Sequence, residues 1–387
     1  MTGPAPVVAA CRHAVRTALE GRTSPILVAC SGGADSLALA AAAAFVAPRL
    51  NLAAGAVIVD HGMQDGSAEV ARVAAGQCRD LGLDPVIIRS VTVSGPGGPE
   101  AAAREARYAA LEAVADETGA STVLLGHTLD DQAETVLLAL ARGAGLRAIA
   151  GMPASRGRYL RPLLGLRRAD TEAACTALGL TWWHDPTNVP GPDAPTRSRL
   201  RGVLPVLTEA LGPGIVAGLA RTASQAQEDA ELLDDLADEL FTRALIPEPG
   251  ESSDAGTLAR GKSSPEPDDG VAPDLSPEPD DGVAPNLSPE PDDGVAPDLS
   301  PDTPILSLDT TTLREAPPAL RSRVIRLALL AAGASGGSLT ATQIGAVRQL
   351  VDNPRGRGPV HVTGDLRARV VCGRLVIWPA PAGERSR

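Results

Sequence analysis

The sequence is poor in aromatic residues, which make up only 2% of its 387 positions. Hydrophobic cores must therefore be built from Ala, Val and Leu, and the total hydrophobic content of 44% is sufficient for globular domains. Lysine is nearly absent too, because Lys262 is the single lysine among 35 basic residues. A catalytic lysine is therefore excluded everywhere else in the chain.

Cysteine pairs and long apolar runs are also missing. The longest apolar run, residues 37–47, is too short to span a bilayer. No C-x-x-C pair occurs, so neither a zinc site nor a disulfide framework is indicated by the five scattered cysteines, Cys11, Cys30, Cys78, Cys175 and Cys372. We therefore expect a cytoplasmic protein without a membrane partner.

The net charge of -12 is concentrated in one segment. Residues 247–303 carry 15 acidic and 2 basic side chains, whereas residues 304–387 carry 12 arginines and 5 acids. The first 246 residues have a net charge of -6. A basic C-terminal part of this kind suits binding to an RNA backbone.

The acidic segment contains an internal repeat. Residues 264–299 hold three copies of a twelve-residue unit with three prolines each, which cannot form the apolar face of a solenoid. We expect an extended, disordered linker. Residues 256–263 match the Walker A pattern, but no strand precedes them and no helix follows, so we interpret the match as chance.

A glycine-containing loop between an apolar run and an alanine-rich run is the most informative stretch. Residues 25–30 predict a strand and residues 37–47 a helix, so the loop lies at a helix N-terminus, which suits phosphate. An acid facing polyphosphate needs a cation between them, so Mg²⁺ is implied at Asp35. The loop residues are Ser31, Gly32, Gly33, Ala34, Asp35 and Ser36.

Strands and helices alternate after this loop. Strands are predicted at 52–60, 85–91 and 121–127, with helices at 67–82 and 99–118 between them. This order is typical of an α/β fold with a doubly wound parallel sheet. Asp60 and His61 end the second strand, where such sheets bind their ligands, and they become candidate nucleotide-binding residues.

The fourth predicted strand ends at His127 and leads into an acidic helix start. Asp131 and Glu134 are three residues apart, so they share one helix face. An acid in a first helical turn often serves only as a cap, which accounts for Asp130 or Asp131 but not for both together with Glu134 and His127. We therefore interpret the group as an active site.

Arg197, Arg199 and Arg201 form an alternating basic run. Spacing alone leaves two interpretations equally open, a solvated surface and a clamp for RNA phosphates. A long amphipathic helix follows between residues 214 and 245. Two helices (320–332 and 340–352) and glycine-broken strands within 358–378 predict a small α+β domain at the C-terminus.

Taken together, these motifs resemble the tRNA(Ile)-lysidine synthetase family of the PP-loop, or N-type ATP pyrophosphatase, superfamily. The first six-residue motif places the chain in the superfamily. The later pieces select the family, and they are residues 59–62, 103–108, 126–135, 142–145, 161–164, 185–188 and 197–201. Two positions depart from the family pattern, with His184 in place of an acid and Ser198 in place of an asparagine.

The resemblance implies an ATP-dependent ligase that joins L-lysine to C2 of the wobble cytidine in isoleucine tRNA with a CAU anticodon. It implies catalytic roles for Asp35, His127, Asp131 and Glu134, with ATP on the Ser31–Ser36 loop, Asp60 and His61. Mg²⁺ would lie at Asp35, and tRNA would contact Arg197, Arg199 and Arg201. The assembly is left open, and a homodimer is allowed.

The expected organisation has four parts. A catalytic domain (1–205) is followed by a helical connector (206–246), the acidic linker (247–303) and a basic tRNA-binding domain (304–387). Two rival functions are weighed, a tRNA thiolase on the same fold and a non-catalytic RNA-binding module. The thiolase would need paired cysteines, and the RNA-binding module would leave the glycine loop and acidic cluster unexplained.

Overall fold

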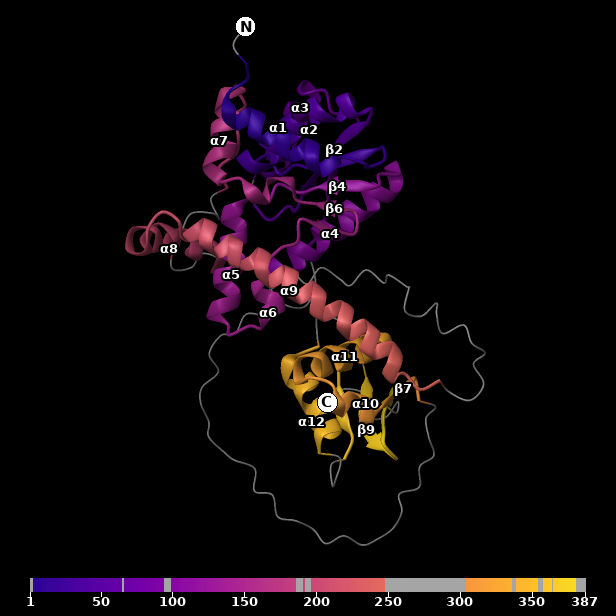
Figure 1. Cartoon of the computed structure of the whole chain (residues 1–387). Helices are drawn as coiled ribbons and strands as arrows, with labels where there is room; N and C mark the ends of the chain where they lie inside the picture. The colour runs from indigo at the N-terminus through magenta and orange to yellow at the C-terminus, as the bar shows by residue number, and fades with distance from the viewer. Residues whose placement is uncertain are drawn as a thin grey trace. The chain divides into compact units, whose positions relative to one another are not determined.

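The computed structural model describes residues 3–64, 66–93, 99–185, 191, 196–247, 304–335, 339–353, 358–363 and 365–380 (Figure 1). These residues form two compact units, the first ending at Gln227 and the second beginning at Glu228. Our expectations of a disordered linker, of its repeats and of a chance Walker A match concern residues 248–303, which lie outside the described residues. So do residues 186–188 of one family motif.

The first unit is built on a six-stranded sheet in the order β3-β2-β1-β4-β6-β5. All neighbouring strands are parallel except the short pair β5–β6, which was not predicted. The predicted parallel α/β fold is therefore confirmed. The strand bounds are Ile26–Ala29 (β1), Ala54–Asp60 (β2), Val86–Ser90 (β3), Thr122–Leu124 (β4), Ser155–Arg156 (β5) and Tyr159–Leu160 (β6).

Helices cover both faces of this sheet, with α1, α2 and α3 on one side and α4 on the other (Figure 1). The predicted helix 99–118 coincides with α4. The helix bounds are Pro6–Leu19 (α1), Ala34–Val46 (α2), Ser67–Asp80 (α3), Pro99–Thr118 (α4), Leu129–Ala141 (α5), Leu146–Ile149 (α6), Arg168–Ala177 (α7), Thr196–Leu211 (α8) and Ile215–Ala244 (α9). Short 3-10 helices lie at Ala47–Leu50 and Pro162–Gly165.

The alternating directions of the side chains along β1 explain why helices pack on both faces of the sheet. Ile26 and Val28 belong to the core cluster with α1 and α2, whereas Leu27 packs with Tyr108 and Leu111 of α4. Successive side chains of a strand point to opposite faces, so a short apolar run serves both layers. Alanines supply most of the buried surface of α2, which lets this helix lie close to the sheet.

The second unit is a four-stranded antiparallel sheet with helices on its buried face. Strand order is β7-β10-β9-β8, and the core includes Ala237, Leu240 and Ala244 from the end of α9. The predicted connector 206–246 is therefore divided between the units. The bounds are Leu306–Asp309 (β7), Thr310–Glu315 (α10), Pro318–Ala331 (α11), Ala341–Asp352 (α12), Val360–Val362 (β8), Leu366–Val371 (β9) and Arg374–Pro379 (β10).

The end of α9 is joined to β7 by backbone pairing. Leu245 forms an isolated antiparallel bridge with Leu308, and the Ile246 N–H donates to the Ser307 carbonyl at 2.9 Å. Ile246 and Ser307, which stand on either side of residues 248–303 in the sequence, are therefore neighbours within the second unit.

In the described ranges, none of the helices taken singly has both the length and the hydropathy to cross a membrane. Helices α8 and α9 meet those two criteria only as a pair, and the pair is bent by 103°.

Candidate active site

The glycine loop lies where the strand order reverses. The chain runs from β1 outward to β2 and β3 and then returns to β4 on the other side of β1. In parallel sheets this reversal opens a crevice at the carboxyl ends of the strands, where ligands bind. The loop that follows β1 leads directly into α2, as predicted.

Hydrogen bonds inside the loop fix its shape. The Ser36 hydroxyl donates to the Gly33 carbonyl at 2.9 Å and accepts from the Ser31 N–H at 3.1 Å. Ser36 is buried and Ser31 is exposed. Ser36 therefore braces the loop, and Ser31 is the hydroxyl of the pair that faces outward. Gly32 has a φ of +83°, which a side chain would strain.

The end of β4 makes a close backbone approach to this loop. A Cβ on Gly126 would lie 3.1 Å from both the Cα and the N of Ser36. Glycine is required at position 126 because the backbone of this segment lies against the backbone of the glycine loop. Both segments were predicted to carry site residues. This contact brings His127 and the start of α5 beside the start of α2.

Asp60 and His61 follow the neighbouring strand β2. The Asp60 carboxylate accepts the Gly62 N–H at 3.0 Å, which shapes the turn after the strand. Burial and the nearby charge of Arg107 lower the pKa of His61, although Asp60 acts in the opposite direction. Both residues border the crevice, in agreement with the position expected from the sheet.

Three acids predicted from the sequence meet around one guanidinium. Arg168, the first residue of α7, contacts Asp131 at 2.7 Å, Glu134 at 3.3 Å and Asp35 at 3.5 Å. The structure thus brings the carboxylate of the loop together with the two carboxylates of α5. Thr171, one turn further along α7, also donates its hydroxyl to Asp35.

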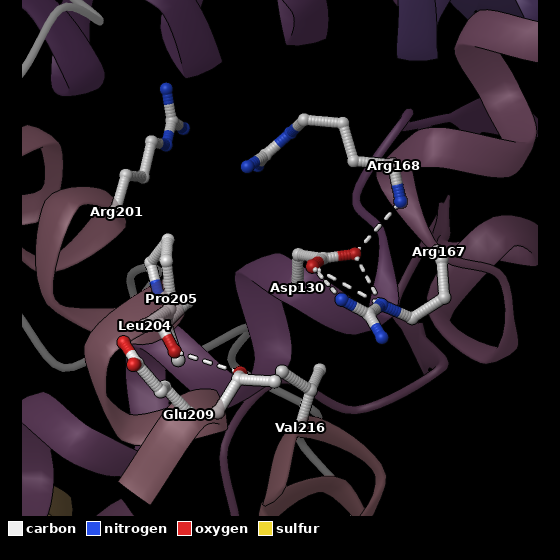
Figure 2. A pocket seen from close by; sticks show the side chains of 9 residues that line it. Asp130, Arg167, Arg168, Arg201, Leu204, Pro205, Glu209 and Val216 are labelled. Atoms are coloured by element: carbon white, nitrogen blue, oxygen red, sulfur yellow. Dashed lines mark hydrogen bonds and ion pairs between the residues drawn. The ribbon is translucent and has the colours of Figure 1, made fainter. Parts of the chain in front are cut away.

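Asp131 serves both as a helix cap and as a member of this cluster. Its Oδ2 accepts the Thr128 N–H at 2.8 Å, which completes a capping box, while its Oδ1 faces Arg168. Asp130 faces away from this cap. Its carboxylate instead accepts the Arg168 N–H at 2.7 Å and a two-pronged contact from Arg167, as Figure 2 shows.

The three acids of the cluster have different proton affinities. Burial raises the pKa of Asp35 to about 6, even though Thr171 and Arg168 favour its ionised form. Burial and the charge of Asp131 also raise the pKa of Glu134. Burial would raise the pKa of Asp131 as well, but the charge of Arg168 and the hydrogen bonds from Thr128 hold it below its usual value.

The predicted arginine run divides into three environments along α8. Arg201 donates from its Nε to Glu134 at 3.0 Å, so it is part of the carboxylate cluster. The charge of Arg197 acts on Arg104 and Arg107 of α4. Arg199 is exposed and donates to Thr196 at 3.1 Å. The three arginines therefore have different surroundings in the described structure.

His127 lies three residues beyond β4, which is shorter than the predicted strand 121–127, and its Nδ1 is buried without a hydrogen-bond partner in the described ranges. Burial and the charges of Arg161, Arg107 and Arg104 lower its pKa to about 3, against the pull of Asp131. The imidazole is therefore neutral near pH 7, able to donate or accept a hydrogen bond but poorly suited to take up a proton.

Sequence reasoning missed the residues that link these acids. Arg167, Arg168 and Thr171 lie at the start of α7, where the sequence analysis assigned no site residue. Arg104, Arg107 and Arg161 entered only as parts of family motifs. A usable signal existed, since three buried acids require buried cations.

An open pocket of about 430 Å³ lies beside the cluster (Figure 2). Charged side chains form one part of its wall, and apolar side chains from α8 and α9 form the other. Its lining comprises Asp130, Arg167, Arg168, Arg201, Leu204, Pro205, Thr208, Glu209 and Val216.

The donor set fits magnesium only if a nucleotide completes it. No three His, Cys, Asp or Glu side chains of the described residues are grouped to hold a metal ion. Mg²⁺ in nucleotide sites is usually held by one or two carboxylates together with phosphate oxygens and water. Asp35, in the first turn of α2, offers such a carboxylate.

Comparison with known proteins agrees with this geometry. Residues 10–207 match the PP-loop domain, and residues 308–376 match the TilS substrate binding domain. The first unit, with its glycine loop at a strand-to-helix junction, is thus an ATP-binding domain of the PP-loop class.

Close relatives identify the family. The tRNA(Ile)-lysidine synthase of Thermobifida fusca is 44% identical over 97% of this chain and 99% of that protein. The corresponding enzyme of Salinispora tropica is 45% identical over 97% of each chain. Among solved structures, the U34-tRNA thiolase NcsA of Methanococcus maripaludis matches at 20% identity and a TM-score of 0.49, covering 57% of this chain and 80% of that chain. The chain belongs to the tRNA(Ile)-lysidine synthase family, which confirms the resemblance.

Proposed function

We propose that this protein uses ATP to ligate L-lysine to C2 of the wobble cytidine of isoleucine tRNA with a CAU anticodon. Family membership supports the tRNA and the product. The geometric observation that carries the proposal is the position of Arg168, which joins the acid of the nucleotide loop to the two acids of α5. The acid of the ATP-binding loop and the acids proposed to bind the lysine amine thereby lie in one site.

In the first step, the C2 oxygen of the cytidine attacks the α-phosphorus of ATP, and pyrophosphate leaves. The N–H groups at the start of α2 bind the leaving pyrophosphate, and Ser36 keeps the loop in the required shape. Asp35, oriented by Thr171 and Arg168, would hold Mg²⁺ against the phosphates. When bound, the metal would neutralise negative charge on the phosphates.

In the second step, the lysine side-chain amine attacks C2 and AMP leaves. Asp131 and Glu134 are suited to bind this amine, which would replace an arginine at one of their oxygens. The raised pKa of Glu134 also suits it to accept the proton that the amine must lose before attack. His127 would contact the substrate as a neutral hydrogen-bonding group.

We propose that residues 304–387 bind the body of the tRNA and that the enzyme works in the cytoplasm, where bacterial tRNAs are modified. The basic composition of this segment supports the first part. Arg197 and Arg199 remain our candidates for tRNA phosphate contacts on the first unit, whereas the pairing of Arg201 with Glu134 gives it a role beside the amine.

A thiolase activity is less well supported. Four of the five cysteines, Cys11, Cys30, Cys78 and Cys175, are buried, and the exposed Cys372 lies in the second unit. Burial raises the pKa of the Cys175 thiol to about 12, so it is a poor nucleophile near pH 7. A non-catalytic RNA-binding role leaves the Arg168 cluster unexplained.

One assay decides between these functions. The full chain is incubated with ATP, Mg²⁺, labelled lysine and tRNA(Ile) with the CAU anticodon. We expect AMP, pyrophosphate and lysine-labelled RNA in equal amounts, and no label on a methionine tRNA with the same anticodon. RNA binding without AMP release would support the binding module. AMP release without lysine label, with sulfur incorporated when a sulfide donor is added, would support the thiolase.

A further inference from the structure

Asp130 is an acid of the active-site region that neither half-reaction uses. Its side chain is only 13% exposed, and it faces the start of α7 rather than the cluster formed by Asp131 and Glu134. Arg167 donates to it from Nε at 3.0 Å and from Nη2 at 2.9 Å. This is the planar two-pronged geometry that gives an arginine–carboxylate pair its directional strength.

The same carboxylate holds the backbone of the next residue. The Arg168 N–H donates to Asp130 Oδ2 at 2.7 Å, so Asp130 fixes both the side chain of Arg167 and the main chain of Arg168. The guanidinium of Arg168 then extends to Asp131, Glu134 and Asp35. Because a side chain is placed by its own backbone, the position of this guanidinium depends on the Asp130 contact.

We propose that Asp130 and Arg167 form a positioning pair that sets the Arg168 guanidinium between the nucleotide-side and amine-side carboxylates of the proposed ligase. The inference rests on the proposed function. The printed contacts of Asp130 are with Arg167 and the Arg168 N–H and do not include the other three acids, so in this proposal the pair acts through Arg168. The contacts of Arg168 to Asp131 and Glu134 are shorter than its contact to Asp35, and we therefore expect lysine transfer to suffer more than adenylation.

The simpler alternative is that Asp130 only caps α7. A cap adds stability to the helix and leaves the chemistry unchanged. Asp170 provides a matched control, because its carboxylate also accepts an N–H at the start of α7, that of Arg167 at 3.0 Å, without contacting the Arg168 guanidinium in the described structure. Asp170→Asn should lower thermal stability modestly and raise KM for lysine much less than Asp130→Asn does, because Asp170 holds neither the Arg167 guanidinium nor the Arg168 N–H in the contacts described.

The test uses the full chain and measures the two half-reactions separately. Exchange of pyrophosphate into ATP with tRNA and no lysine reports adenylation, and lysine incorporation reports transfer. For Asp130→Asn and Arg167→Ala we expect KM for lysine to rise about tenfold or more, with pyrophosphate exchange within about twofold of wild type. Arg167→Lys, which keeps one donor, should recover part of the loss.

A double variant separates positioning from stability. If Asp130 acts through Arg168, Asp130→Asn should add little to the kinetic defect of Arg168→Ala, although their effects on the melting temperature add. Equal lysine KM in wild type and Asp130→Asn, or kinetic defects that multiply in the double variant, would overturn the positioning role. Absence of lysine incorporation by the wild type would instead refute the proposed function.

Discussion

At the level of single residues, the acids of the carboxylate cluster have different partners and therefore different roles, although the sequence alone does not distinguish them. Asp35 belongs to the phosphate loop, Asp131 divides its two oxygens between a cap and Arg168, and Glu134 is paired with two arginines. The sequence predicted that these acids would gather, because the strand ends lie side by side. It could not assign their partners, since Arg168 and Arg201 come from helices far away in the chain.

Asp35→Asn should abolish adenylation. The substitution keeps the shape and the contact with Thr171 but removes the charge needed to hold a cation against phosphate. We expect pyrophosphate exchange to fall by at least about a hundredfold, with tRNA affinity unchanged in a filter-binding assay. Normal AMP release by this variant would remove Asp35 from the nucleotide site.

His127 should make stability depend on pH. Its folded pKa of about 3 lies below the ordinary histidine value of 6.5, so the unfolded chain binds a proton that the folded chain refuses. This contribution to stability is complete above about pH 6.5 and is lost progressively as the pH falls toward the folded pKa. Lowering the pH from 7.5 to 5.5 should cost ~1 kcal/mol through this residue alone.

Urea unfolding at the two pH values measures this cost. His127→Asn should lose less stability between pH 7.5 and 5.5 than the wild type does. His13, an exposed residue of α1, provides the control as His13→Asn. An identical pH dependence in wild type and His127→Asn would show that folding does not lower the pKa of this ring.

At the level of helices and strands, the regular pattern was predictable and the short elements were not. Periodic apolar residues located α3, α4 and α12 to within about two residues, because long elements average over many positions. The two-residue strands β5 and β6 carry too few side chains to show a pattern. Helix α8, which begins at Thr196 and contains Pro205, was represented in the sequence analysis only by its alternating arginines.

The approach of β4 to α2 gives a prediction for these two elements. Gly126→Ala places a methyl group 3.1 Å from backbone atoms of Ser36, which cannot move aside as a side-chain end would. We expect a loss of about 1–3 kcal/mol in stability and a weaker affinity for ATP, measured by calorimetry. Gly145→Ala is the control, because an added Cβ there meets nothing within 4 Å. Unchanged ATP binding in Gly126→Ala would show that the two backbone segments can move apart without a loss of ATP affinity.

Across the entire chain, charge separates the catalytic part from the basic C-terminal part. The arginines of the second unit are not equivalent, however. Arg321 donates to the carbonyls of Leu313, Arg314 and Ala316 and pairs with Asp352, so its task is structural. Arg374 on β10 is exposed, and Arg369 on β9 follows the buried Ala368, so its side chain points to the opposite face of the sheet.

Arg369 and Arg374 should therefore contribute to tRNA binding. The double variant Arg369→Ala/Arg374→Ala should reduce the slope of log affinity against log salt by about 0.7–0.9 for each phosphate that is no longer neutralised, and it should raise KM for tRNA. ATP binding should be unaffected. Arg321→Ala should instead lower the melting temperature. An unchanged salt slope in the double variant would move the tRNA contacts to other residues.

Deleting residues 264–299 should leave catalysis unchanged, since proline-rich acidic repeats offer no apolar face. The pairing of Leu245 with Leu308 is formed without them. Shortening the segment by more than half should also stabilise the fold slightly, by about 0.6–1 kcal/mol of loop-closure entropy. Loss of most of the activity after this deletion would show that the repeats contribute to the reaction.

The backbone contact between Ile246 and Ser307 also makes the segment between them a suitable site for inserting a foreign domain. The chain leaves and re-enters the second unit at neighbouring positions, so a foreign domain whose own termini lie close together can replace the repeats without pulling α9 away from β7. A fluorescent protein inserted there would report the enzyme's abundance in living cells while both termini of the chain stay free.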